Sequence, residues 1–466
     1  MLFSSGIFIF AFLPAVLFLY YTVCRKSRKK QNVLLALASL FFYAWGEPVF
    51  VFIMLGVIVI NYLFALKIDK VRQNKKQAKM LVALMLLINL AIFFVFKYLT
   101  FTADNLNAVL NLNINVPKIA LPIGISFFMF QAISYVIDVY RGHGQVQKNL
   151  LNVVLYISFF PQLIAGPIVR YQTIAEQIND RKENAEDFAD GVCRFIVGIG
   201  KKTLLANTLA IVADSAFAQP EQNSVALAWL GALAYTFQIY FDFSGYSDMA
   251  LGLGKMFGFK FLENFDYPYI SKSVSEFWRR WHISLGSWFR DYVYFPLGGS
   301  RVNSKARLVF NLFVVWAFTG IWHGANWTFI VWGLMYFVFI TLEKLTGFAE
   351  KLKGFGHVYT LFLVVLGWVL FRSESITDAF GYIGNMFGAG GNALVDDQAV
   401  FLLGQNAFFF AGAVIFSTPV AKLLRTKFGH TKVANVLYPV GLIAVLIVSV
   451  SYIIKGSYNP FIYFNF

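Results

Sequence analysis

The amino-acid sequence predicts an all-α protein that crosses a lipid bilayer many times. Of its 466 residues, 58% are hydrophobic and only 14% are charged, whereas about a quarter of the residues in soluble domains are charged. Long apolar stretches recur along the whole chain, and short basic or polar stretches separate them. Aromatic residues make up 18% of the chain, which suits membrane interfaces and helix packing better than a nucleic-acid surface. The net charge of +15 therefore needs a membrane explanation.

The apolar stretches can be assigned in order along the chain as helices that enter or cross the hydrocarbon core. They cover residues 2–23, 33–46, 48–66, 80–99, 119–140, 191–217, 224–244, 308–322, 325–345, 357–372, 400–420 and 433–454. Two of them, 33–46 and 357–372, are shorter than the roughly 20 residues of a full crossing and are expected to be tilted or partial. We therefore expect about 10–12 transmembrane helices.

The basic residues predict the orientation of these helices. Residues 25–30 carry five basic side chains and residues 67–79 carry six, each group directly beside an apolar stretch. Basic loops of this kind face the cytoplasm, so residues 100–118, which are rich in Asn, are expected outside. The stretch 2–23 is interpreted as a first span, because its positive charges follow it and no cleavage pattern is evident. Twelve spans then put both termini on the extracytoplasmic side.

Two regions do not fit a simple span. Residues 156–170 include two prolines and a glycine within an apolar run too short to cross, which predicts a re-entrant segment. Residues 259–307 mix aromatic and arginine side chains, as in a cytoplasmic-side segment that dips into the headgroups. Between them, residues 172–190 are polar and are expected to form a surface helix.

A single histidine, His323, lies in the 35 residues from 308 to 342, which contain no Asp, Glu, Lys or Arg. Glycines on both sides, Gly320 and Gly324, predict a break or a close approach of the backbone there. An ionisable side chain at membrane depth is costly and is a candidate for function. Its imidazole could take a proton from a hydroxyl and return it to a leaving group. The alternative is a core histidine whose nitrogens bind backbone carbonyls or Asn326.

A second histidine, His282, lies in the basic and aromatic segment 275–285. At helical spacing it falls close to a face that carries Trp278, Trp281 and Leu285. The segment could anchor a helix at the headgroups, and Arg279 and Arg280 could bind a phosphate-bearing ligand. Neither histidine belongs to an HExxH or CxxC pattern, so a metal site has little support.

Two further features have both a structural and a functional interpretation. Asp242 and Asp248 surround a glycine at a predicted span end, where they could cap a helix or form the polar wall of a substrate tunnel. The tail 456–466 is apolar but too short to span, which suits an interfacial aromatic segment. A tyrosine in this tail could act as a nucleophile if a base activates it.

Taken together, these residues resemble the membrane-bound O-acyltransferase family, in particular its bacterial branch that includes the alginate O-acetylation membrane protein. The matching segments are 3–5, 159–170, 240–248, 277–285, 292–301, 322–324 and 461–464, and they follow one another over nearly the whole chain. The resemblance implies one integral membrane domain over 1–466, with helices and re-entrant segments around a central tunnel. It implies His323 as the catalytic base at the constriction and His282 as a second catalytic histidine.

The resemblance also implies the substrates. The acyl donor would be acetyl-coenzyme A on the cytoplasmic side, with no bound cofactor and no metal, and Tyr463 in the tail would relay the acyl group. The expected substrate contacts are Arg279, Arg280, Trp278, Trp322, Asn326, Asp242 and Asp248. An extracytoplasmic SGNH-hydrolase-like transferase would then esterify a polysaccharide hydroxyl.

The implied function is O-acetylation of an extracytoplasmic polysaccharide, such as alginate or another exopolysaccharide, by a multi-pass protein of the bacterial cytoplasmic membrane that does not bind nucleic acid. Peptidoglycan O-acetylation and teichoic acid D-alanylation are close alternatives, although the aromatic motif fused to this chain favours acetyl transfer. A transporter would be expected to show paired repeats, which are not found in this sequence. A non-catalytic scaffold of a polysaccharide export complex is the remaining alternative.

Overall fold

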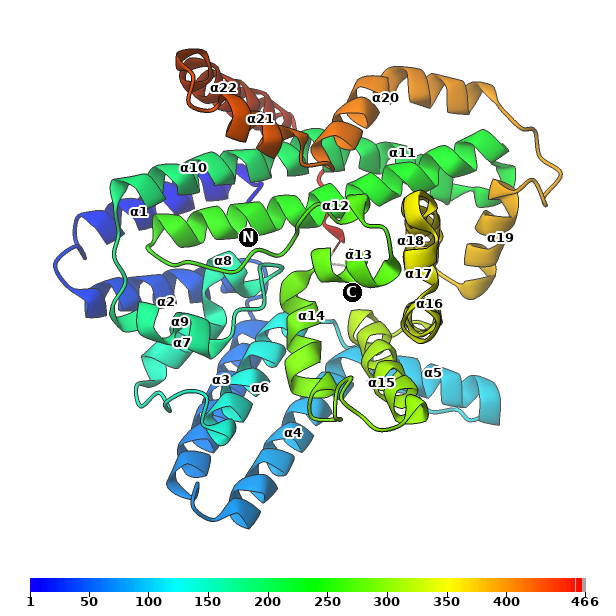
Figure 1. The fold of residues 1–466 in the computed structure, drawn as a ribbon. Helices are drawn as coiled ribbons and strands as arrows, with labels where there is room; N and C mark the ends of the chain where they lie inside the picture. The colour runs from blue at the N-terminus through cyan, green and yellow to red at the C-terminus, as the bar shows by residue number, and fades with distance from the viewer. Residues whose placement is uncertain (457, 463–466) are drawn as a thin grey trace. The chain divides into compact units, whose positions relative to one another are not determined.

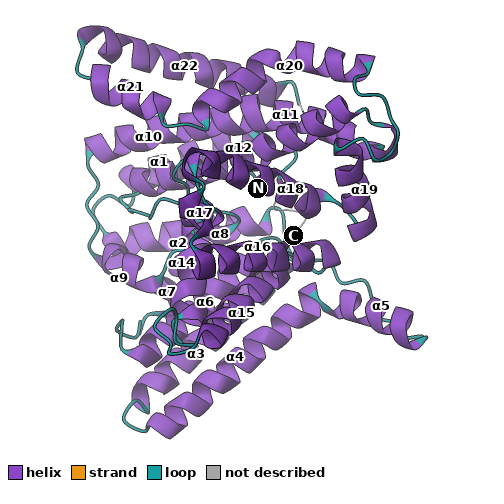
Figure 2. Cartoon of the chain, turned by 45° about the vertical axis from the view of Figure 1, so that its right-hand side comes forward, coloured by secondary structure: helices purple, strands orange, loops and turns teal. Residues whose placement is uncertain are grey.

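Every regular element of the described chain is a helix, as Figure 2 shows. The computed structural model describes residues 1–456 and 458–462, and no strand occurs among them. The all-α fold class expected from composition and periodicity is therefore confirmed. Tyr463, the expected relay residue, lies outside the described residues.

The chain divides by its internal contacts into two compact units. The first comprises residues 1–195 and 247–262, and the second comprises residues 196–246 and 263–466. The single membrane domain expected over 1–466 stays a prediction. Both candidate histidines belong to the second unit, so the candidate site is built from this unit.

The first unit contains a π-helix at Phe8–Phe12 and the helices that precede α11. These are α1 (Leu13–Tyr21), α2 (Arg28–Ala44), α3 (Phe50–Lys70), α4 (Lys75–Lys97), α5 (Leu99–Leu110), α6 (Ile125–Arg141), α7 (Leu150–Ser158), α8 (Phe160–Leu163), α9 (Tyr171–Asn179) and most of α10 (Ala185–Gly200). Helix α3 packs against α4, α6 and α7. The region 156–170 is broken as expected, because α7 ends at Ser158 and α8 has a proline in its first turn.

The second unit contains the helices from α11 onwards. They are a π-helix at Lys201–Ala206, α11 (Asn207–Ala218), the first part of α12 (Val225–Met256), α13 (Val274–Arg280), α14 (Ile283–Phe289), α15 (Lys305–His323), α16 (Trp327–Thr346), α17 (Phe348–Lys351), α18 (Gly356–Arg372), α19 (Ile376–Met386), α20 (Asp397–Phe416), α21 (Val420–Phe428) and α22 (Lys432–Ile454). Short helical turns occupy Pro220–Gln222, Pro268–Ile270, Arg290–Tyr294 and Lys353–Phe355. Helix α16 packs against α13, α15 and α18.

Eight helical segments of the described chain are long and apolar enough to cross a membrane, which supports the expected polytopic class. They are Phe50–Lys70, Lys75–Lys97, Ala185–Ala218, Lys305–His323, Trp327–Thr346, Lys353–Arg372, Asp397–Phe416 and Lys432–Ile454. The other expected spans, at 2–23, 33–46, 119–140 and 224–244, correspond to helices that do not meet both requirements. Of these, Phe8–Tyr21 is apolar but shorter.

The turn expected at Gly245 is wrong, because α12 continues through it as one helix from Val225 to Met256. The glycine permits a close approach instead. A Cβ at Gly245 would lie 2.9 Å from the Gly198 carbonyl oxygen and 3.1 Å from the Lys202 nitrogen. A single glycine weakens a helix by only about 1 kcal/mol relative to Ala, so packing of this kind can outweigh it.

Candidate active site

The candidate site centres on His323, the last residue of α15. The helix stops there because Gly324 is extended, with φ −176° and ψ 159°. His323 is 6% exposed, and its ring meets three aromatic rings edge to face. The ring centroids lie 4.9 Å from Trp322, 4.9 Å from Trp332 and 5.1 Å from Phe371. The break and the burial expected at this histidine are therefore both confirmed.

Close packing of α15 against α16 holds His323 in place. A Cβ at Gly320 would lie 2.6 Å from the Phe329 carbonyl oxygen, and one at Gly333 would lie 2.6 Å from the Trp316 carbonyl oxygen. Glycines on both helices thus let the two backbones approach, as in tightly packed membrane helices. Gly320 therefore sets the position of the turn that ends at His323.

Aromatic side chains extend the environment of His323 towards α13. Trp332 lies 5.3 Å from Trp278, which in turn lies 5.1 Å from Trp316 and 4.9 Å from Tyr336 between ring centroids. Such edge-to-face packing in a buried cluster leaves little water around a base. Trp278 therefore belongs to the aromatic cluster that contains Trp332, a neighbour of His323, and substrate contact by Trp278 stays a prediction.

His282 lies at a sharp bend of the chain between α13 and α14, which Figure 1 shows as two separate short helices. The continuous helical face expected over 275–285 is wrong, because Trp281 is extended and His282 is left-handed, with φ 45°. The bend nevertheless turns the histidine inwards, and it is only 2% exposed. Its ring meets Phe243 of α12 at 4.6 Å.

An asparagine determines which nitrogen of His282 carries the proton. The Asn264 side-chain oxygen accepts hydrogen bonds from the Ser284 backbone nitrogen at 3.1 Å and the Ser284 hydroxyl at 2.9 Å. His282 Nδ1 lies 3.2 Å from the same oxygen, so Nδ1 is the protonated nitrogen and Nε2 is the basic one. Burial lowers the pKa of His282 to about 3, which keeps the ring neutral.

The rings of both histidines lie close to one indole ring. Trp322 is 6.1 Å from His282 and 4.9 Å from His323 between ring centroids, and it is 3% exposed. The structure therefore brings together His282, Trp322 and His323, which the sequence had placed in one site from separate segments.

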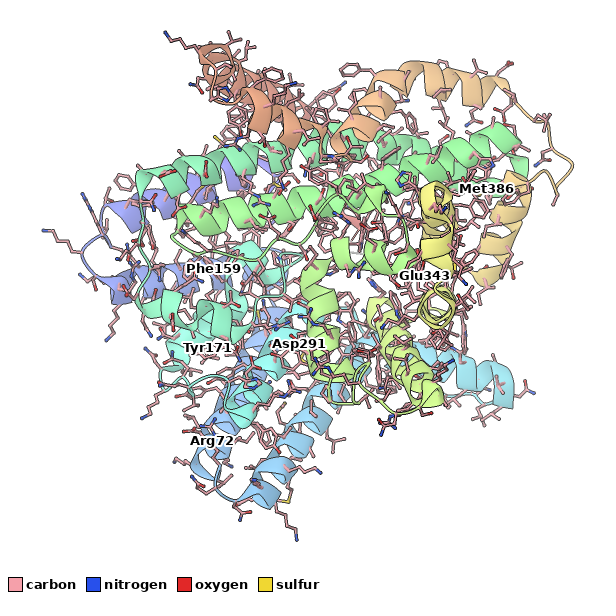
Figure 3. All side chains as sticks on the ribbon, viewed as in Figure 1. Arg72, Phe159, Tyr171, Asp291, Glu343 and Met386 are labelled. Carbon is pink, nitrogen blue, oxygen red and sulfur yellow. The ribbon has the colours of Figure 1, made fainter. Side chains whose placement is uncertain are left out.

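A carboxylate on α16 holds the helix that leads to His282. Glu343, labelled in Figure 3, is 7% exposed and accepts hydrogen bonds from the first turn of α13. These come from the Val274 nitrogen at 2.7 Å, the Ser275 nitrogen at 2.9 Å and the Ser275 hydroxyl at 2.6 Å. The negative charge also complements the positive end of the helix.

Asp242 and Asp248 belong to two different ion pairs on α12, so neither caps a helix end. Within the second unit, Asp242 pairs with Lys202 at 2.6 Å, and both side chains are almost fully buried. Within the first unit, Asp248 pairs with Arg194 at 2.9 Å. Substrate contact by either aspartate stays a prediction.

The tail preceding Tyr463 binds to this same part of the second unit. Asp242 accepts a hydrogen bond from the Ile462 nitrogen at 2.9 Å, and Lys202 donates one to the Pro460 carbonyl oxygen. Phe461 and Ile462 are each 5% exposed. The tail is thus packed into the unit that contains both histidines.

The other expected contacts differ in their availability for a ligand. Arg280 binds Glu276 at 3.0 Å and Asp266 at 2.9 Å, whereas Arg279 is exposed. The Asn326 side chain caps α16 and donates to the Glu374 carbonyl oxygen at 2.8 Å. Arg279 is therefore the better placed arginine for a phosphate, and Asn326 has a structural role in ending the loop after His323.

Three residues described above were missed by the sequence reasoning: Lys202, Asn264 and Glu343. One signal could have indicated Lys202. It falls inside the stretch 191–217, where a charge must pair or face a cavity. Asn264 and Glu343 carry no such signal, because their partners are distant in sequence.

Comparison with known proteins agrees with this geometry. Residues 145–371 match the family model of the membrane-bound O-acyltransferases. A probable alginate O-acetylase of Pseudomonas putida is 41% identical over the full length of both chains. One of Pseudomonas syringae pv. tomato is 46% identical over 84% of this chain and 76% of its own. A peptidoglycan O-acetyltransferase of Helicobacter pylori is 34% identical over 91% of this chain and 87% of its own.

Proposed function

Because this chain belongs to the membrane-bound O-acyltransferase family, we propose that it acetylates a polysaccharide outside the cell, most simply alginate, from a donor inside it. It is a multi-pass membrane protein and an acyltransferase. The observation that carries the proposal is the burial of His323 and His282 next to the same indole ring, that of Trp322. A water-poor pair of imidazoles suits acyl transfer, since water would hydrolyse the donor.

Acetyl-coenzyme A is the proposed donor, bound from the cytoplasmic side. The exposed Arg279 supports this assignment, because a guanidinium can pair with the phosphates of the nucleotide. The basic clusters at 25–30 and 67–79 support a cytoplasmic location for the loops that carry them. Both termini then lie on the extracytoplasmic side of the bacterial inner membrane.

The proposed chemistry uses the tail as a relay. His323 removes the phenolic proton of Tyr463, and the oxygen attacks the thioester carbonyl of the donor. The carbon–sulfur bond breaks, and the thiolate takes the proton from His323 and leaves as free coenzyme A. A phenol has an ordinary pKa near 10, so it needs a base to react well at neutral pH. In this chemistry His282 acts through Nε2, the basic nitrogen of its ring, because Nδ1 donates its proton to Asn264.

An extracytoplasmic partner completes the proposed cycle. A hydroxyl of an SGNH-hydrolase-like transferase attacks the acetyl-tyrosine, the aryl ester bond breaks, and the phenol is restored. The partner then passes the acetyl group to the polysaccharide. Peptidoglycan acetylation follows the same chemistry, and the relative from Helicobacter pylori favours keeping it as the second candidate.

The test measures acetyl transfer in the purified full chain incubated with acetyl-coenzyme A labelled in the acetyl group. The chain should gain a labelled acetyl group on Tyr463, located by mass spectrometry of the C-terminal peptide. His323→Ala should reduce this label at least about 100-fold, as expected for loss of a general base. Tyr463→Phe, which removes only the hydroxyl, should abolish it.

Cells provide the second readout. Full polymer acetylation by well-expressed Tyr463→Phe protein would exclude the relay, and full acetylation by His323→Ala would exclude the base. Loss of acetyl groups from alginate rather than from peptidoglycan would identify the acceptor. If the protein were only a scaffold, His323→Ala would leave the acetylation of both alginate and peptidoglycan unchanged.

A further inference from the structure

A buried ion pair links the π-helix at Lys201–Ala206 to α12. Lys202 and Asp242 lie 2.6 Å apart, with side chains only 3% and 2% exposed. Taking two charges out of water is expensive, and well-packed apolar side chains of similar size often stabilise a fold as well or better. We therefore expect a further group to form hydrogen bonds with the ammonium and carboxylate groups of this pair.

That partner is the backbone of the C-terminal tail. Lys202 donates to the Pro460 carbonyl oxygen, and Asp242 accepts from the Ile462 nitrogen at 2.9 Å. The pair thus binds one carbonyl and one N–H of the tail, two residues apart, whatever the side chains are. Between them, the Phe461 ring lies 5.1 Å from Tyr246 and 5.7 Å from the Lys202 ammonium group.

Two contacts fix the tail just before this point. The Tyr458 hydroxyl donates to Asp214 at 2.7 Å, and Asp214 also pairs with Arg372. The Asn207 amide donates to the Asn459 side-chain oxygen at 3.2 Å. The Arg372 guanidinium stacks over two rings, Phe217 at 4.9 Å and Tyr235 at 5.0 Å, so this outer anchor is itself held firmly.

Consecutive residues of α12 contact the tail and His282. Asp242 binds the tail, and Phe243 contacts the His282 ring at 4.6 Å. Tyr463 is the next residue of the chain after Ile462, which the clamp holds.

We propose that Lys202 and Asp242 form a docking clamp that binds the tail backbone at Pro460 and Ile462 and so positions Tyr463 for acyl transfer. This inference rests on the proposed relay function. Lys202 and Asp242 are positioning residues in it, because they act through the tail.

The variants must remove the clamp without leaving a buried charge. A single Asp242→Asn change leaves Lys202 uncompensated and can unfold the protein. The double variant Lys202→Met with Asp242→Val removes both charges together. From the tail side, Ile462→Pro deletes the N–H that Asp242 accepts, whereas Ile462→Val keeps it and is the matched control. Lys255→Met on α12, which loses the pair with Asp190 of α10, controls for charge removal.

The first measurement follows the tail without any donor, so it does not depend on the proposed function. Backbone hydrogen exchange at Ile462 should be slow in the wild type and at least about 10-fold faster in the double variant, since a charge-assisted hydrogen bond is lost. Lys202→Arg keeps a charge and a donor and should retain the protection, as should Lys255→Met. Unchanged exchange in a folded double variant would overturn the clamp.

The second measurement follows the acetyl group on the C-terminal peptide. The double variant and Ile462→Pro should each carry at least about 10-fold less acetyl label on this peptide than Ile462→Val. A released tail that is still fully acetylated would overturn the positioning role. A wild type without any label would instead overturn the relay, while the exchange experiment would still decide the clamp.

Discussion

His282 shows how one neighbouring side chain sets the chemistry of a residue. Asn264 accepts two hydrogen bonds from Ser284, which fixes its oxygen as an acceptor, and this oxygen then holds the Nδ1 proton of His282. Nε2 is then the basic nitrogen, and burial keeps the ring neutral. A neutral acceptor can take part in acyl transfer over the whole physiological pH range.

Asn264→Asp should change the pH dependence of acetyl transfer. The new carboxylate would face the Nδ1 proton of His282 and raise the pKa of the imidazole, since an opposite charge stabilises the protonated ring. With a raised pKa, the ring becomes protonated at a higher pH. As the pH is lowered, the variant should therefore lose activity at a higher pH than the wild type. The rate of label incorporation, measured as a function of pH, tests this.

The matched control for that experiment is Asn74→Asp, at an exposed residue before α4 whose side-chain oxygen accepts a hydrogen bond from the Gln77 nitrogen, as a carboxylate also can. It should leave the pH profile unchanged. If Asn264→Asp is active and its rate decreases at the same acidic pH as that of the wild type, the role assigned to Asn264 is contradicted.

At the scale of elements, the packing of α15 against α16 determines where His323 lies. The two helices approach at Gly320 and Gly333, and α15 ends three residues after Gly320. Glycine is needed here for close backbone approach and not for its conformational freedom. The same helix pair also presents Glu343, which holds α13 and the bend that follows it.

Gly320→Ala should therefore destabilise the protein and impair catalysis together. Its Cβ would lie 2.6 Å from the Phe329 carbonyl oxygen, so the two helices must separate. Overpacking of this kind typically costs about 1–3 kcal/mol. Thermal unfolding in detergent measures the loss of stability, and labelled acetyl transfer measures the displacement of His323.

Gly404→Ala on α20 is the control, because a Cβ there would meet nothing within 4 Å. It should be neutral or increase stability by up to about 1 kcal/mol, since Ala favours a helix more than Gly. Equal losses in both variants would argue against close packing as the reason for Gly320.

At the scale of the whole molecule, the stability of the folded chain should depend on pH through a charged cluster outside the spans. In the first unit Glu183 binds Arg28 and the Tyr20 hydroxyl and lies 3.6 Å from Arg181. Burial opposes ionisation of this carboxyl, but hydrogen bonds from Arg28 and Tyr20 outweigh it and lower the pKa of Glu183 below its usual value.

The lowered pKa predicts the sign of the pH effect. Stabilisation by Glu183 is fully present above the pKa of the unfolded chain and is lost as the pH falls through the lower pKa of the folded chain. Glu183→Gln should reduce stability at neutral pH by about 1–3 kcal/mol. In thermal unfolding, the difference in unfolding temperature between wild type and Glu183→Gln should become smaller as the pH decreases. Glu186→Gln, at an exposed residue, should unfold at the wild-type temperature at every pH.

The sequence and the tertiary structure each determined different properties of this protein. The sequence by itself predicted the all-α membrane class, the break at His323 and the family, because composition and short motifs are local properties. It was wrong about the turn at Gly245 and the continuous helix through His282, since packing of distant segments outweighs local preference at both places.

Only the tertiary structure decided which side chains act together. It brought both His282 and His323, which are 41 positions apart in the chain, close to Trp322, and it joined Lys202 to a tail residue more than 250 positions away. Such pairings follow from how buried polar groups find partners once the helices have packed. No pattern along the chain records them.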